Sequence, residues 1–98
     1  MEPNRIILEA IATRRCLEGV YNRMAVKLAP HILYTRHDEL YVDAVTLERD
    51  GQPPREIKVG SFKLTGLREP RLGTDSFEPQ DVFDRSAERY EGVTLVAV

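Results

Sequence analysis

The spacing of the hydrophobic positions changes along this chain, and the change separates its elements. Near the start, Ile7, Ala10 and Ile11 recur at the three- and four-residue spacing of one helical face. Pro3 suits the first turn of a helix, where its missing N–H is not needed. We therefore predict a helix over residues 3–14 that buries its apolar face against a sheet.

Beyond this helix, apolar and polar positions alternate with the two-residue period of half-buried strands. The predicted extended segments are residues 17–21, 23–28, 31–35, 40–47, 55–59 and 62–64. We expect Pro30 to interrupt or end a strand, because proline cannot donate to a sheet ladder. Residues 50–54 form the clearest turn, and Gly60 and Ser61 are expected to separate the last two strands.

The last third of the chain has a different character. Residues 66–80 are rich in Gly, Pro, Asp and Ser, which predicts an irregular linker, with Phe77 and Phe83 as its anchors. Residues 81–90 favour a weak helix. Residues 93–98 are strongly strand-like and should pair either with the preceding strands or with a neighbour's sheet.

Short strands with closely spaced turns after one helix predict a mainly β fold, a small five-stranded barrel or sandwich rather than a parallel α/β sheet. A length of 98 residues suits one domain. We expect residues 1–65 to form the helix and barrel. Residues 66–98 would supply a linker, an acidic tail segment and a C-terminal strand that packs on the barrel or on a partner.

Charge and cysteine content narrow the classes of protein. The net charge of −2 argues against a strongly basic nucleic-acid coat. Residues 73–98 hold two arginines and six acidic residues, so they form either a solvated surface segment or a tail that shields a basic face. Cys16 is the sole cysteine, which fits a reducing compartment and the role of a small buried residue.

The apolar runs of the sequence indicate where in the cell the protein is expected. We find no charged-apolar-small leader and no apolar run long enough to span a bilayer. The sequence therefore predicts a cytoplasmic protein with no membrane partner.

Four segments together resemble the WYL family, a small bacterial β-barrel domain thought to sense ligands in transcriptional regulators. They are Tyr21, Val26–Pro30, Leu40-Tyr41-Val42 and Arg55–Phe62. Leu40 stands in place of the family's tryptophan, and Ser61 in place of its second arginine, whereas Lys58 keeps the positive charge of the first. The resemblance covers roughly residues 6–65. It implies an SH3-like or Sm-like barrel with an N-terminal helix, without the winged-helix DNA-binding domain of longer members.

The resemblance also implies a ligand site. Its residues would be Tyr21, Arg23, His31, Tyr41 and Lys58. Two aromatic rings offer stacking surfaces, arginine binds phosphate or carboxylate through two bonds, and lysine acts as a point charge. This set fits a nucleotide-like or other small anionic ligand, or a short single-stranded nucleic acid. Taken singly, the tyrosines fit half-buried strand residues, and His31 fits a surface or hydrogen-bonded histidine.

No catalytic class is favoured. The sequence lacks a nucleophile-base-orienter set, a glycine-rich phosphate loop and the clustered His and Cys of a metal site, so we expect no enzyme, no cofactor and no metal. The leading hypothesis is a non-catalytic ligand-sensing module of WYL type. The alternatives are a structural, oligomerisation or adaptor protein that uses the C-terminal strand, and an Sm-like single-strand RNA binder. Under these hypotheses, we expect the chain to form a homo-oligomer or to bind a regulatory partner protein.

Overall fold

The computed structural model describes residues 3–98, with side chains from residue 5 onward, and begins with the predicted helix. Helix α1 spans Pro3–Thr13. Arg14 then adopts a left-handed backbone (φ 56°), which ends the helix. Ile7, Ala10 and Ile11 are buried, as their spacing predicts.

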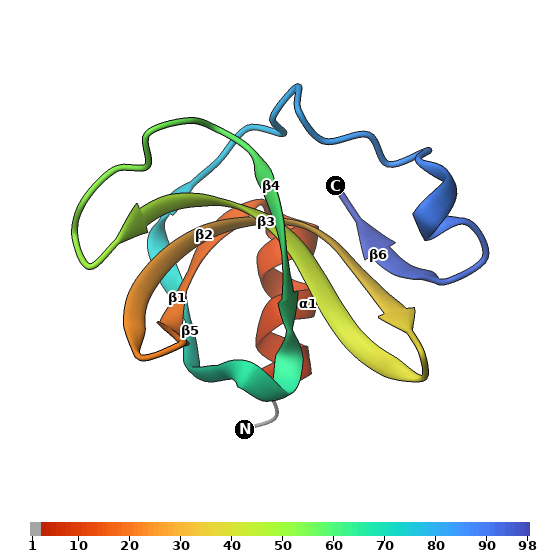
Figure 1. Ribbon diagram of the computed structural model, residues 1–98, viewed down its shortest axis with the longest axis horizontal. Helices are drawn as coiled ribbons and strands as arrows, with labels where there is room; N and C mark the ends of the chain where they lie inside the picture. Colours follow the sequence, from red (N-terminus) through yellow and green to blue (C-terminus); the bar gives the residue numbers. More distant parts are fainter. Residues whose placement is uncertain (1–2) are drawn as a thin grey trace.

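The remaining described chain forms an antiparallel sheet. Its strands are β1 (Arg15–Tyr21), β2 (Met24–Arg36), β3 (Glu39–Arg49), β4 (Val59–Lys63), β5 (Leu67–Ser76) and β6 (Thr94–Ala97). The order is β4-β3-β2-β1-β5, and β6 pairs with β2 (Figure 1). Short 3-10 turns lie at Leu64–Gly66 (η1) and Glu88–Tyr90 (η2). The fold is therefore mainly β with one N-terminal helix and an open antiparallel sheet.

Strand β2 continues through Pro30, so the prediction that this proline interrupts or ends a strand is wrong. The first half of β2 pairs with β1 as far as Leu28, and the second half pairs with β6 from Ile32 onward. Pro30 lies between these two partners, next to a register shift against β3. A proline is tolerated at such a bulge because no ladder hydrogen bond is lost there.

The predicted linker over residues 66–80 is also wrong for most of its length, because residues 67–76 form β5. This strand pairs with β1 at the end of the sheet and carries two register shifts. Pro70 is accommodated on this edge strand. A Cβ added to Gly73 would lie 3.0 Å from the Glu18 carboxylate and 3.2 Å from the Cys16 carbonyl, so the glycine permits close pairing. The Gly and Pro residues, which are typical of a loop, here belong to an irregular edge strand.

Three other boundaries differ from the sequence prediction. Strand β4 runs through Gly60 and Ser61 because both pair with β3. Residues 55–58, expected as a strand, form part of a loop, and the predicted helix over residues 81–90 is reduced to η2. The turn at residues 50–54 is confirmed, with Gly51 at φ 81°.

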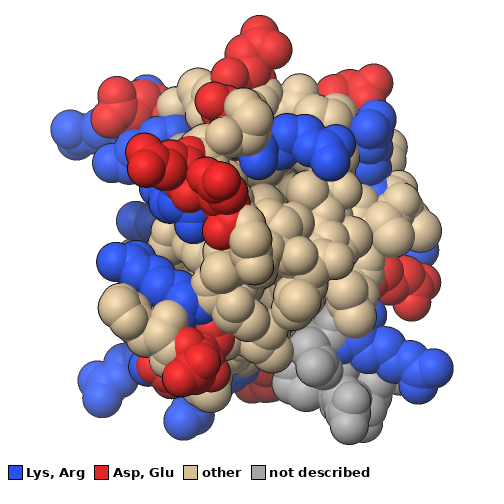
Figure 2. Space-filling model, turned by 90° about the vertical axis from the view of Figure 1, so that its right-hand side faces the viewer, with Lys and Arg blue, Asp and Glu red and all other residues tan. Residues whose placement is uncertain are grey.

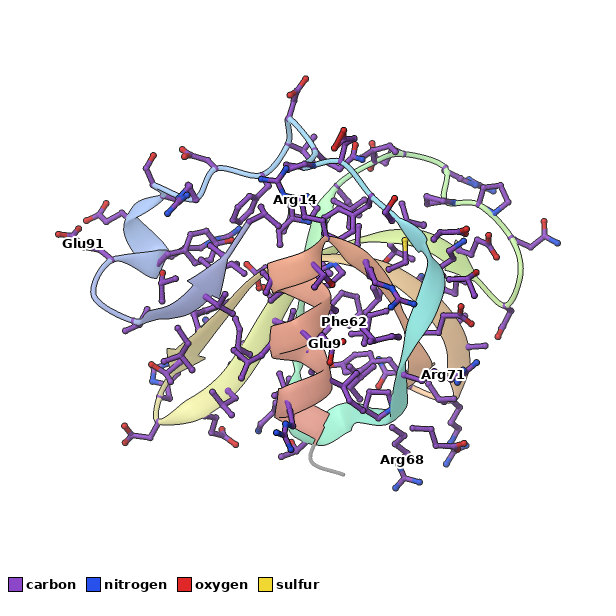
Figure 3. The ribbon with its side chains drawn as sticks, turned by 180° about the vertical axis from the view of Figure 1, so that it is seen from behind. Glu9, Arg14, Phe62, Arg68, Arg71 and Glu91 are labelled. Atoms are coloured by element: carbon purple, nitrogen blue, oxygen red, sulfur yellow. The ribbon has the colours of Figure 1, made fainter. Side chains whose placement is uncertain are left out.

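The two faces of the sheet have separate covers. Helix α1 lies across one face, as seen from behind (Figure 3), and packs on Leu17, Leu28, Val42 and further apolar residues. Residues 77–98, which we call the strap, run along the upper side of the molecule in Figure 1 and return as β6 beside β2; side chains before β6 cover the opposite face of the sheet. The predicted anchors Phe77 and Phe83 both pack on this face. Cys16 is buried beside Phe77.

Within residues 3–98, no helix combines the length and the apolar character needed to cross a membrane.

Candidate functional site

A cavity of about 660 Å³ lies beneath the loop that joins β3 to β4. Its volume falls within the usual range for small-molecule sites, roughly 300–1,000 Å³. Apolar groups of Met24, Phe62 and two consecutive prolines line it, and its basic lining residues are Arg49, Arg55 and Lys58. The site therefore combines an apolar surface with cations.

The rim of this cavity is held by backbone hydrogen bonds. The Asp50 amide donates to the Ala25 carbonyl over 2.7 Å, and the Asp50 carboxylate accepts the Ala25 N–H over 2.9 Å. Arg49 and Gln52 exchange two backbone hydrogen bonds across the turn. Proline at positions 53 and 54 restricts the chain that follows. The start of the loop, at residues 49–52, is thus held in a defined conformation at the rim of the cavity.

The charged groups that line the cavity differ in whether another group of the protein already binds them. The carboxylate of Asp50 is engaged by the Ala25 N–H, and Glu56 lies 3.9 Å from the Lys58 amino group. The ion pairs among the described side chains do not include Arg49 or Arg55. Two guanidinium groups are therefore available to an anion that enters the cavity.

The five residues predicted from the sequence are not gathered in this cavity. Lys58 lines it, and Arg23 lies in the exposed β1–β2 turn beside the lining residue Met24. Tyr21 packs edge-on against Phe62 at 4.9 Å on the helix-covered face, and its hydroxyl accepts the Lys63 N–H over 3.3 Å.

Tyr41 belongs to the opposite face of the sheet. Its ring stacks on Tyr34 with the ring centroids 6.1 Å apart, and the guanidinium of Arg36 lies 5.9 Å from it. His31 is buried on this strap-covered side. The structure thus separates the two tyrosines that were expected to share a pocket.

Sequence reasoning missed Arg49 and Arg55. The signal available was their position, because they flank the turn at residues 50–54 on both sides. No such sequence signal indicated that Phe62 would line the cavity. Its place beneath the loop depends on how β4 pairs with β3.

A second polar cluster lies under the strap. The fully buried carboxylate of Asp43 accepts hydrogen bonds from the hydroxyls of Tyr34 (2.7 Å) and Tyr90 (2.5 Å). The guanidinium of Arg89 lies 3.4 Å from the same carboxylate and donates to the Tyr90 hydroxyl over 2.8 Å. Burial raises the pKa of both tyrosines. Their hydroxyls therefore stay protonated and act as hydrogen-bond donors to the Asp43 carboxylate.

His31 forms a further contact between sheet and strap. Its ring lies 5.2 Å from Phe77 and 5.1 Å from Phe83, measured between centroids. Nδ1 is 2.7 Å from the Ala29 carbonyl oxygen, and Nε2 accepts the Gln80 N–H over 2.9 Å. Burial lowers the pKa of His31, because a charged ring would lose its hydration.

The described side chains contain no group of three or more His, Cys, Asp and Glu placed to hold a metal ion. Comparison of the chain with protein-family models, with curated proteins and with solved structures finds no match.

Proposed function

We propose that this chain is a non-catalytic ligand-sensing module of WYL type, which binds a nucleotide-like or other anionic ligand in the cavity beneath the β3–β4 loop. The observation that carries the proposal is the pair of unengaged guanidinium groups, Arg49 and Arg55, beside Lys58 and an apolar floor. A lining that combines cations with apolar groups fits a ligand with a charged head and a flat or apolar body.

The strand connectivity supports the finer assignment to an SH3-like or Sm-like barrel. Strands β1 to β4 follow one another in the sheet, and β5 returns to the far side of β1. Strands β4 and β5 lie at opposite ends of this order, yet only the short turn η1 joins them. A sheet whose two ends are linked this closely must bend strongly, which is how a small barrel of this kind is built.

Isothermal titration calorimetry with GDP, ADP and inorganic phosphate tests the proposal. We expect a nucleotide to bind, and we expect Lys58→Glu to weaken its binding about tenfold or more, because a hydrogen bond to a charged group contributes roughly 1.5–3 kcal/mol. Arg5→Glu makes the same change in net charge on the exposed side of α1. It should leave the affinity unchanged.

Three results would redirect or contradict the proposal. Binding that survives Lys58→Glu but is lost in Tyr41→Ala would place the ligand on the Tyr41 surface instead of in the cavity. A steep loss of affinity with salt, accompanied by a preference for oligonucleotides, would favour the single-strand RNA binder, since each neutralised phosphate adds to the salt slope. Absence of binding to all three probes would count against the nucleotide-like class.

A structural or oligomerisation role is the second candidate, and one surface favours it. The side of the molecule that carries β6 presents a broad uncharged area bounded by charged side chains (Figure 2). Leu95 of β6 is 56% exposed. Strand β6 pairs with β2 on one side, and its other edge can take a second copy of β6 by strand addition.

Sedimentation velocity over a range of concentrations tests this second candidate. A dimer that Leu95→Glu converts to a monomer would support it. Val82→Glu is the matched control, because Val82 is 50% exposed but lies outside β6. A monomer at all concentrations would exclude pairing through this edge.

A further inference from the structure

The strap is attached to the sheet through a histidine whose protonation state is fixed by its partners. A carbonyl oxygen can only accept, so Nδ1 of His31 must carry a proton to bond the Ala29 carbonyl. A backbone N–H can only donate, so Nε2 must be unprotonated to accept the Gln80 N–H. Both bonds form together only in the neutral ring with its proton on Nδ1.

A second proton on Nε2 is incompatible with this arrangement. It would place an N–H group against the Gln80 N–H, and the hydrogen bond would be replaced by repulsion. The charged ring would also be buried beside Phe77 and Phe83, where an unpaired charged N–H group is costly. All three of these partners belong to the strap.

The backbone of His31 also holds the strap. Its carbonyl oxygen accepts the Val98 N–H over 2.9 Å, just beyond the end of β6. The Thr35 N–H donates to the Val93 carbonyl over 3.1 Å at the other end of that strand. Displacement of the His31 ring would therefore also disturb the His31 backbone, which helps to align β6 with β2.

We propose that His31 is a pH-sensitive latch: the strap is closed while this ring is neutral, and protonation of the ring releases residues 77–98 from the sheet. Release would uncover the edge of β2 at residues 32–34 and the apolar face beneath the strap. The proposal is independent of the ligand cavity, which lies beneath a different segment.

Other titratable and charged groups lie on the elements around His31. The sheet face under the strap carries Cys16 on β1, Tyr34 on β2, and Tyr41 and Asp43 on β3, and the strap itself carries Glu78, Asp81, Asp84, Arg85, Glu88, Arg89, Tyr90 and Glu91. Backbone groups occupy both ring nitrogens, so none of these side chains bonds the imidazole. Burial lowers the pKa of His31, and the hydrogen bond to the Ala29 carbonyl opposes this effect in part.

The direction of the pH effect follows from linkage. The closed state lowers the pKa of His31, whereas a released ring titrates near its ordinary value of about 6.5. Closure is therefore complete above about pH 6.5 and weakens as the pH falls from there towards the lowered pKa of the closed state. Each pH unit in this window should raise the opening constant up to about tenfold.

Amide hydrogen exchange by NMR on the full chain, at pH 7.5 and pH 5.5 and corrected for intrinsic rates, tests the latch. The Val98 and Thr35 amides report on the strap, and the Leu17 and Leu28 amides report on the β1–β2 pairing. We expect the strap amides to lose protection up to about tenfold at pH 5.5 while the β1–β2 amides keep theirs.

Two variants assign the effect to one ring. His31→Gln cannot titrate in this range, and its side-chain oxygen can accept the Gln80 N–H, so the strap should stay closed at both pH values. His37→Gln removes the other histidine, which is exposed in the β2–β3 turn, and should keep the wild-type response.

The outcomes either support or overturn the latch. Equal strap protection at both pH values in the wild type overturns it, and so does a response that persists in His31→Gln. Should that variant fail to fold, the His31 ring resonances of the wild type decide. Protonation that coincides with strap opening supports the proposal, and opening while the ring stays neutral overturns it.

Discussion

The two covered faces of the sheet are held by different physics. The buried side chains of the face under α1 are all apolar, with Leu17, Leu28 and Val42 as typical members. The face under the strap contains the two fully buried polar side chains of the described core, His31 and Asp43. The stability of the helix-covered face depends on buried apolar area and close packing. The stability of the strap-covered face depends also on hydrogen-bond donors and acceptors in matching positions.

This difference sets how each cover responds to change. Apolar packing is not directional, so α1 is insensitive to pH and is weakened mainly by lost volume. A buried hydrogen bond contributes little net stability while it is made, but it is costly when one partner is removed. We therefore expect the strap to be the part of the molecule that opens locally and the helix-covered face to report global unfolding.

The largest expected effect is on the helix-covered face. Leu28→Ala should lower the free energy of unfolding by about 2–5 kcal/mol, because it leaves a cavity in fully packed surroundings. Urea denaturation followed by circular dichroism measures it. Val82→Ala, at a half-exposed strap position, should change stability by less than about 0.5 kcal/mol. Similar losses in the two variants would contradict the contrast between the faces.

A smaller and local effect is expected under the strap. Tyr90→Phe removes one hydroxyl from the buried Asp43 carboxylate and should cost about 1–3 kcal/mol. Tyr41→Phe makes the same chemical change on the same face, where the described contacts of Tyr41 involve its ring, and should cost less. Hydrogen exchange should show the Tyr90→Phe loss at the Val98 amide. A loss spread evenly over β1 and β2 would mean that strap and sheet unfold as one unit.

The sequence predicts the helix-covered face well, because local periodicity determines it. The spacing of Ile7, Ala10 and Ile11 leads directly to the buried side of α1. The alternation in residues 40–47 likewise predicts the central part of β3. Strand β5 escaped prediction because Pro70 and Gly73 allow its irregular pairing, and the same residues also favour loops.

The candidate site was less predictable, because long-range register decides it. Register shifts in β2 and β1 fix which face each side chain takes, and they place Tyr21 and Tyr41 on opposite faces. His31 is buried by Phe77, Gln80 and Phe83, which lie far along the chain. Lys58 lines the cavity because the β3–β4 loop carries it there, which strand periodicity could not indicate.

A third prediction separates the rim of the strap cluster from its buried centre. The side chain of Arg89 is 58% exposed, and its guanidinium lies 4.9 Å from the ring of Tyr90. Solvent screens its attraction to Asp43, so Arg89→Ala should cost less than about 1 kcal/mol. Urea denaturation at low and high salt measures this cost. A loss as large as that of Tyr90→Phe would show that the charge, rather than the hydroxyl, holds the strap.

The smallest expected change in stability is at the cavity, which neither cover forms. The side chain of Lys58 is 78% exposed and its one ion pair, with Glu56, is equally open to solvent. Lys58→Glu should therefore shift the free energy of unfolding by less than about 0.5 kcal/mol, as measured by urea denaturation. Arg5→Glu should shift it equally little. If Lys58→Glu alone unfolds the loop or the sheet, its effect on ligand binding cannot be assigned to a lost contact, and the cavity residues then belong to the structural framework. A variant that keeps its stability but loses affinity separates binding from folding, because the cation acts on the ligand alone.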